Sequence, residues 1–284
     1  MLKLIRPLHL FLAALTYTLG ISLANYLGHP FSANIFWLGL VVSLLTQLSM
    51  SLLADVFRLD VEPLLEKETR SERQTLRNNT LYVSIASLAV IAFITYLLFV
   101  NHQLPAAAFF FLVLSLILIL VYSLPQFRGR GLSEFLLAVQ LAYVFPSFAF
   151  ILQSGETHRF LTLTIPLVFL AFAYFILMTF QSFASDRKYG RVTFLTQLGW
   201  ERVVPLHHFL VLLAYLLFFT SPAFGVSLSL IWRVFLALPF AIFQILQLRS
   251  ISLGAPPNWA LLSVTAFATF GLTTYLLMLT FWLR

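Results

Sequence analysis

The chain contains no cysteine and little charge. Only 10% of its 284 residues are charged, whereas soluble domains average about 25%. The absence of cysteine excludes a disulfide framework, a thiolate metal site and a cysteine nucleophile. So few charged side chains cannot cover the surface of a water-soluble protein of this length. Soluble enzymes, secreted disulfide scaffolds and disordered tails are therefore excluded.

What the chain has instead is apolar sequence: 61% of its residues are hydrophobic and 31 are Phe. A membrane-crossing helix needs about 20 mostly apolar residues. Windows of that length predict nine spans, at 8–27, 35–54, 81–100, 105–124, 134–153, 160–180, 207–226, 227–248 and 260–283. The runs are continuously apolar, which indicates helices rather than barrel strands. We therefore predict one all-α integral membrane domain over 1–284, whose first span is retained because no cleavage pattern follows it.

The basic residues predict the orientation of this domain. Most of the 17 lysines and arginines fall at the N-terminus or in loops that follow even-numbered spans, above all loops 55–80 and 181–206. By the positive-inside rule, the N-terminus and these two loops are cytoplasmic and the C-terminus lies on the opposite side. The net charge of +7 thus sets orientation, and no nucleic-acid partner is expected.

Two acidic residues stand at the openings of these loops. Asp55 ends the second span and Asp186 follows the sixth, and each is succeeded by basic residues. A carboxylate at a membrane boundary is costly without a partner. Ordinary interfacial ion pairs would satisfy both groups. Alternatively, carboxylates hold magnesium that engages substrate phosphates, while lysine and arginine neutralise the remaining phosphate charge.

Three motifs resemble the UbiA-type intramembrane prenyltransferases. Residues 186–193 read D-R-K-Y-G-R-V-T and look like the family's D-R-x-x-G-K-R-T. Residues 130–134, R-G-L-S-E, are similar to the R-G-L-G-E of the menaquinone branch, which prenylates dihydroxynaphthoate, and Arg6-Pro7 resembles the family's entry to its first helix. Family members have nine transmembrane helices and two Asp-rich loops, after helices two and six. The resemblance covers nearly the whole chain and implies a UbiA-type helical bundle.

At two positions the chain departs from the family pattern. Arg58 and Ser182 stand where the family usually has metal-binding acids. Asp60 replaces one of them only if the second helix has ended by that point, because on a helix it would point away from Asp55. Arg58 suggests another compensation, in which a fixed cation contacts the diphosphate directly.

The resemblance implies the following site. Magnesium would be held by Asp55, Asp186 and Asp60, and Asp55, Asp186 and Tyr122 would be the catalytic residues. The residues expected to bind the diphosphate are all basic: Arg58, Arg73, Arg77, Arg187, Lys188 and Arg191. The implied reaction transfers a prenyl group from a prenyl diphosphate to an aromatic or quinone-precursor acceptor, within the bilayer.

Two other functions remain open. Because two motif acids are replaced, the chain could be a catalytically degenerate UbiA-like protein that binds a prenyl lipid or a partner. A transporter is the third hypothesis, although no span carries paired intramembrane charges or clear discontinuities.

Overall fold

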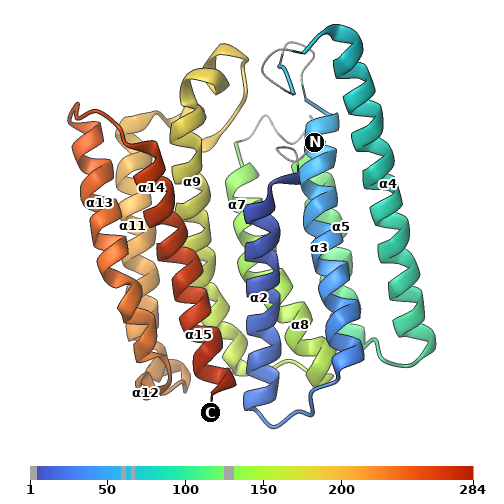
Figure 1. Ribbon diagram of the computed structural model, residues 1–284. Helices are drawn as coiled ribbons and strands as arrows, with labels where there is room; N and C mark the ends of the chain where they lie inside the picture. Colours follow the sequence, from blue (N-terminus) through green and yellow to red (C-terminus); the bar gives the residue numbers. More distant parts are fainter. Residues whose placement is uncertain (1–4, 59–61, 65–67, 125–130, 284) are drawn as a thin grey trace.

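The protein is a bundle of long helices. The structure, a computed structural model, describes residues 5–58, 62–64, 68–124 and 131–283, and no strand occurs among them. Within that part of the chain, nine helices are long and apolar enough to cross a membrane. This confirms the predicted all-α architecture with nine spans (Figure 1).

Five spans are continuous helices and four are interrupted. The continuous ones are α2 (Pro7–Tyr26), α3 (Ala33–Val56), α4 (Arg70–Val100), α5 (Ala106–Ser123) and α11 (Trp200–Phe219). The interrupted ones are α7 (Ser133–Val139) with α8 (Phe145–Ser154), a 3-10 turn (Arg159–Leu163) with α9 (Thr164–Lys188), α12 (Leu228–Ile231) with α13 (Leu238–Ser252), and α14 (Trp259–Phe267) with α15 (Thr273–Trp282). Two of the interruptions are π-helical turns, Gln140–Val144 and Ala268–Leu272. A further short helix, α10 (Phe194–Leu198), precedes α11.

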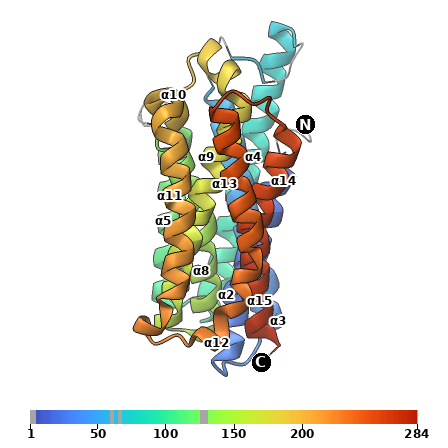
Figure 2. The same ribbon diagram turned by 90° about the vertical axis from the view of Figure 1, so that its left-hand side faces the viewer.

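The most buried helices are α9 and the α7–α8 pair, and the most exposed are α4 and α13. α9 packs against α7 and α11, while α2 packs against α8, α3 and α15. α4 and α13 lie at opposite edges of the bundle (Figures 1 and 2). A helix at an edge presents most of its surface to lipid, so its exposed apolar side chains are the expected arrangement in a membrane.

Several helices extend beyond the predicted spans and into the two predicted loops. The loops at 55–80 and 181–206 are largely helical, because α4 begins at Arg70, α9 continues to Lys188 and α11 begins at Trp200. The early start of α4 has a local cause: Thr69 and Glu72 form a capping box that satisfies its first backbone N–H groups. A search for apolar windows cannot detect such polar extensions.

The charged helix ends meet at one end of the bundle, which we call the charged end. α3 and α9 end there, and α2, α4 and α7 begin there, whereas α15 ends at the opposite end (Figure 1). This arrangement brings the residues around Asp55 and Asp186 to the same end of the molecule.

Candidate functional site

Two clusters of charged residues, which we call the two mouths of the site, lie at the charged end. The first mouth is centred on Asp55, in the last turn of α3. Its side chain is 1% exposed. One oxygen, Oδ1, accepts hydrogen bonds from Arg58 Nε at 3.0 Å and Arg6 Nη2 at 3.3 Å, and lies 2.8 Å from Arg58 Nη2. The other oxygen, Oδ2, is buried with no hydrogen-bond partner. Asp55 is therefore held by two cations and keeps one oxygen unused.

Arg6 reaches this mouth from an unusual backbone conformation. It immediately precedes α2 with φ of 50° and ψ of 67°, a left-handed region that non-glycine residues rarely adopt. Its Nη1 donates to the Tyr122 hydroxyl at 3.3 Å. Burial alone would lower the pKa of Arg6, but attraction to Tyr122 and Asp55 outweighs burial and raises that pKa. Arg6 is thus a permanent cation at the start of the first span.

The second mouth is built on Asp186, in the last turn of α9. Ser182 lies one turn earlier on the same face, and its Oγ donates to Asp186 Oδ2 at 2.7 Å. Arg191 Nη1 donates to Asp186 Oδ1 at 3.5 Å. Serine thus occupies the place where the resemblance expects a second carboxylate, and it hydrogen-bonds the carboxylate that is present.

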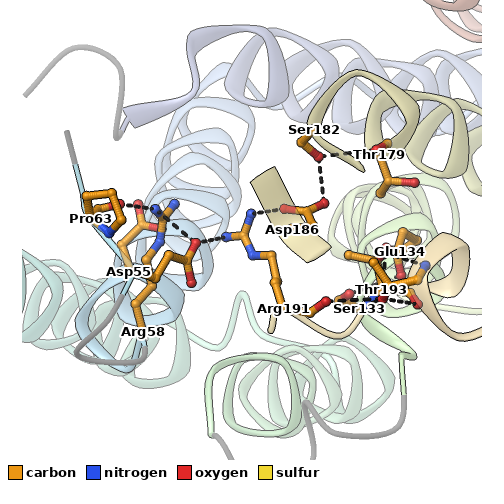
Figure 3. A network of polar contacts seen from close by, with 12 residues as sticks. Asp55, Arg58, Pro63, Ser133, Glu134, Thr179, Ser182, Asp186, Arg191 and Thr193 are labelled. Carbon is orange, nitrogen blue, oxygen red and sulfur yellow. Dashed lines mark hydrogen bonds and ion pairs between the residues drawn. The ribbon is translucent and has the colours of Figure 1, made fainter. Parts of the chain in front are cut away.

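Glu62 connects the two mouths. Its Oε1 lies 3.3 Å from Arg58 Nη1 and 3.3 Å from Arg191 Nη2. Arg58 also contacts Asp55 and Arg191 also contacts Asp186, so the five groups form one continuous chain of ion pairs. Figure 3 shows Asp55 and Arg58 at one end of this chain of ion pairs and Arg191 and Asp186 at the other.

Two cavities open around the chain of ion pairs. The first, of about 560 Å³, which we call the inner cavity, lies among α2, α7 and α9. Its lining combines charged groups with apolar side chains such as Leu137, Phe175 and Met178. The second, of about 690 Å³, which we call the outer cavity, is lined mostly by charged and polar residues, together with Pro63, Leu64 and Ala184. Glu62, Asp186 and Arg191 line both cavities, whereas Asp55 lines neither. The second mouth therefore faces the cavities, and the first lies behind its arginines.

Comparisons with known proteins give a clear answer for the fold only. No protein-family model matches the sequence, and no curated protein matches it. Solved structures do match: a UbiA homologue from Archaeoglobus fulgidus bound to GPP and Mg²⁺ superposes with a TM-score of 0.67 at 17% identity, covering 96% of this chain and 98% of that one. The protein has the UbiA-type fold.

Two further structures agree. Digeranylgeranylglyceryl phosphate synthase gives a TM-score of 0.64 at 16% identity, with 100% of this chain and 98% of that chain covered. An apo UbiA homologue from Aeropyrum pernix K1 gives 0.55 at 14% identity, with 94% of each chain covered. The UbiA-type fold therefore accounts for the whole length of the chain.

The predicted diphosphate-binding residues divide into two groups on this fold. Arg58, Lys188 and Arg191 line the second cavity, and Arg191 also lines the first. The others line neither cavity: Arg73 pairs with Glu68 at 2.6 Å, Arg77 donates to the Arg58 carbonyl at 2.6 Å, and Arg187 is exposed. Arg77 therefore helps to position the backbone of Arg58, and Arg73 ties Glu68, in the segment before α4, to the first turn of that helix.

Tyr122 and Asp60 complete the set of predicted site residues. Tyr122 lies on α5 and is buried against Arg6, lining neither cavity. Asp60, the third predicted metal ligand, lies outside the described residues. Among the residues that are described, no three His, Asp or Glu side chains form a group that could hold a metal.

The available carboxylates nevertheless suit magnesium that arrives with a phosphate ligand. Magnesium is typically bound through one or two carboxylates together with substrate phosphates and water. Asp186 lines both cavities, and Asp55 Oδ2 is a buried carboxylate oxygen without a partner. Asp186 therefore fits a metal whose remaining ligands come from the substrate, whereas Asp55 Oδ2 lies away from both cavities.

Three residues that line the inner cavity are not among the predicted catalytic, metal-binding or diphosphate-binding residues. Arg6 and His9 enter from α2 and Glu134 from the first turn of α7. Glu134 is buried and accepts a hydrogen bond from Ser133 Oγ at 3.0 Å. Arg6 and Glu134 belong to two of the motifs that resemble the UbiA family, whereas the only sequence signal of His9 is its position near the charged end of a span.

Proposed function

We propose that the protein transfers a prenyl group from a prenyl diphosphate to an acceptor inside the membrane. One observation carries the proposal: a chain of ion pairs joins Asp55 and Asp186 at the mouth of a cavity that continues into apolar side chains. A charged mouth suits a diphosphate and the apolar lining suits a prenyl chain. Support comes from the UbiA-type fold, since UbiA homologues from Archaeoglobus fulgidus have been solved with GPP or DMAPP and Mg²⁺.

The basic residues would hold the diphosphate. Arg58, Lys188 and Arg191 line the outer cavity, where their charges can neutralise phosphate oxygens. Magnesium, held by Asp186, would supply further positive charge for the leaving diphosphate, while Asp55 would hold Arg6 and Arg58 in place. The allylic C–O bond then breaks, and its electron pair stays on the diphosphate oxygen.

The inner cavity would shelter the carbocation and the acceptor. Tyr174 and Phe175 line it, and their ring faces stabilise positive charge. An aromatic or quinone-precursor acceptor would form the new carbon–carbon bond with a ring electron pair and then release its ring proton to the departed diphosphate. The likeness of residues 130–134 to the menaquinone branch supports such an acceptor. Glu134 ends that motif and lines the cavity.

The charged end would face the cytoplasm, with the end of α15 on the opposite side, because the basic residues gather at the charged end. A soluble prenyl diphosphate would then enter from the cytoplasm, and its tail would extend toward the bilayer interior.

A catalytically degenerate, lipid-binding relative is the second candidate. Asp55 is already neutralised by two arginines, and Ser182 replaces a carboxylate. Both features reduce the capacity for metal while leaving the apolar cavity intact. Such a protein would bind a prenylated lipid at the same place without turning it over.

One assay separates the two candidates. Purified protein in detergent is mixed with magnesium, labelled geranyl or geranylgeranyl diphosphate and a panel of aromatic acceptors. We expect release of diphosphate and a prenylated product. Absence of turnover, together with unchanged lipid binding in Asp55→Ala and Asp186→Ala, would support the non-catalytic candidate.

A further inference from the structure

Glu62 occupies the place where a substrate anion would be expected. Its carboxylate is 8% exposed and bridges Arg58 and Arg191, with 3.3 Å between Oε1 and each guanidinium. Both arginines line the outer cavity, and Glu62 lines both cavities. A negatively charged ligand that contacts these two arginines therefore competes with Glu62 for the same donors.

The local charge balance points the same way. The cluster contains the carboxylates of Asp55, Glu62 and Asp186 and the guanidiniums of Arg6, Arg58 and Arg191, so it is neutral without any ligand. A prenyl diphosphate carrying one magnesium has about one net negative charge, as Glu62 does. Exchanging one for the other keeps the cluster neutral, whereas adding the ligand beside Glu62 leaves an uncompensated anion at a partly desolvated site.

We infer that Glu62 is an internal substitute for the substrate's diphosphate: it holds Arg58 and Arg191 in the resting protein and must leave them when the diphosphate binds. The contact is thus autoinhibitory. It keeps two partly buried arginines paired in the empty site and weakens the binding of any anion that cannot displace it. This inference rests on the proposed function, because it assumes that the site binds a diphosphate.

The neighbouring segment provides the means of release. Arg58 Nη1 also donates to the carbonyl of Pro63 at 3.2 Å, and Leu64, next in the chain, is 8% exposed. If the diphosphate takes Arg58 Nη1, Glu62 and the Pro63 carbonyl lose this shared donor together, and we expect the Leu64 side chain to become more accessible. The accessibility of residue 64 therefore reports whether Glu62 still contacts its arginines.

The first test measures binding of inorganic pyrophosphate, with magnesium, by calorimetry in detergent. Glu62→Gln keeps the shape of the side chain and removes its charge, so we expect the dissociation constant to fall about fivefold or more, a typical coupling between two sites. Glu201→Gln is the matched control, since Glu201 is an exposed residue of α11. Removing its charge should leave the dissociation constant within about twofold of the wild type.

The second test uses the absence of native cysteine. In Leu64→Cys, which keeps Glu62, a maleimide should label the thiol at least about threefold faster once pyrophosphate and magnesium are added, a change typical of local opening. Val203→Cys, a fully buried position in α11, should show no change. This reporter decides the question even if Glu62→Gln does not fold.

The outcomes separate the inference from the function beneath it. Tighter pyrophosphate binding by Glu62→Gln with faster labelling of Leu64→Cys supports the inference. Binding by the wild type that is unchanged or weakened in Glu62→Gln, or unchanged labelling, would show that Glu62 is a fixed strut and overturn the inference alone. No pyrophosphate binding by either the wild type or Glu62→Gln would overturn the proposed function as well.

Discussion

The two mouths of the site look alike in the sequence and differ in the structure. Each has an aspartate in the last turn of a spanning helix, followed by arginine. Asp55 is fixed by Arg6 and Arg58 and lines neither cavity. Asp186 is held by Ser182 and a longer contact to Arg191, and it lines both cavities. We conclude that the first mouth mainly anchors cations and the second mainly faces the ligand.

The sharpest test of this difference is Asp186→Asn. The change keeps the size of the side chain and removes the charge that would hold magnesium beside the substrate. We expect diphosphate release to fall about 100- to 1000-fold, the range seen when one electrostatic group at a reacting centre is removed. The rate should be measured at saturating magnesium. A variant that retains more than about a tenth of the wild-type rate would contradict the assignment of Asp186 to the ligand.

Asp55→Asn should act on stability instead. It leaves Arg6 and Arg58 without their shared counter-charge, and removing one partner of a buried ion pair costs about 3–5 kcal/mol. Both arginines keep some contact with water, 22% and 13% of their side-chain surfaces, so we expect a smaller loss, about 2 kcal/mol. Thermal unfolding in detergent measures it, with Asp186→Asn for comparison. An unchanged melting temperature with lost activity would make Asp55 a ligand and remove the distinction between the mouths.

Tyr122→Phe should give the smallest effect. The hydroxyl makes one hydrogen bond with Arg6, at 3.3 Å, and faces neither cavity. Its loss should cost about 1.5 kcal/mol, the lower end of the range for a hydrogen bond to a charged group, or about tenfold in turnover. A loss beyond about 100-fold, at unchanged melting temperature, would instead place Tyr122 among the catalytic residues.

The sequence was sufficient to predict the helices but not their full length. Apolar runs of spanning length specify nine helices because burial in lipid requires them. The polar extensions of α4, α9 and α11 depend on local devices such as the Thr69–Glu72 capping box, which contribute no hydropathy. The helices therefore continue into the predicted loops, and Asp55 and Asp186 lie in the last turns of α3 and α9.

The ion-pair chain shows what the sequence could not specify. Glu62 and Arg191 are far apart in the chain, and their contact depends on where the bundle places the segments that follow α3 and α9. Neither composition nor spacing encodes that pairing. Arg6 was likewise inaccessible, because its role depends on a left-handed backbone conformation at the start of α2. The motif positions indicated which loops matter, and tertiary packing decided which partner each charged group takes.

The π-helical turn between α7 and α8 also bears on the site. Such a turn holds one residue more than an α-helical turn, so it offsets the two halves of the span by about 100°. In α8, after the turn, Phe145–Leu152 are buried throughout. In α7, before the turn, Glu134 lines the inner cavity. A single extra residue thus sets the rotational phase between the packed part of this span and the part that faces the cavity, independently of any side chain in the cavity.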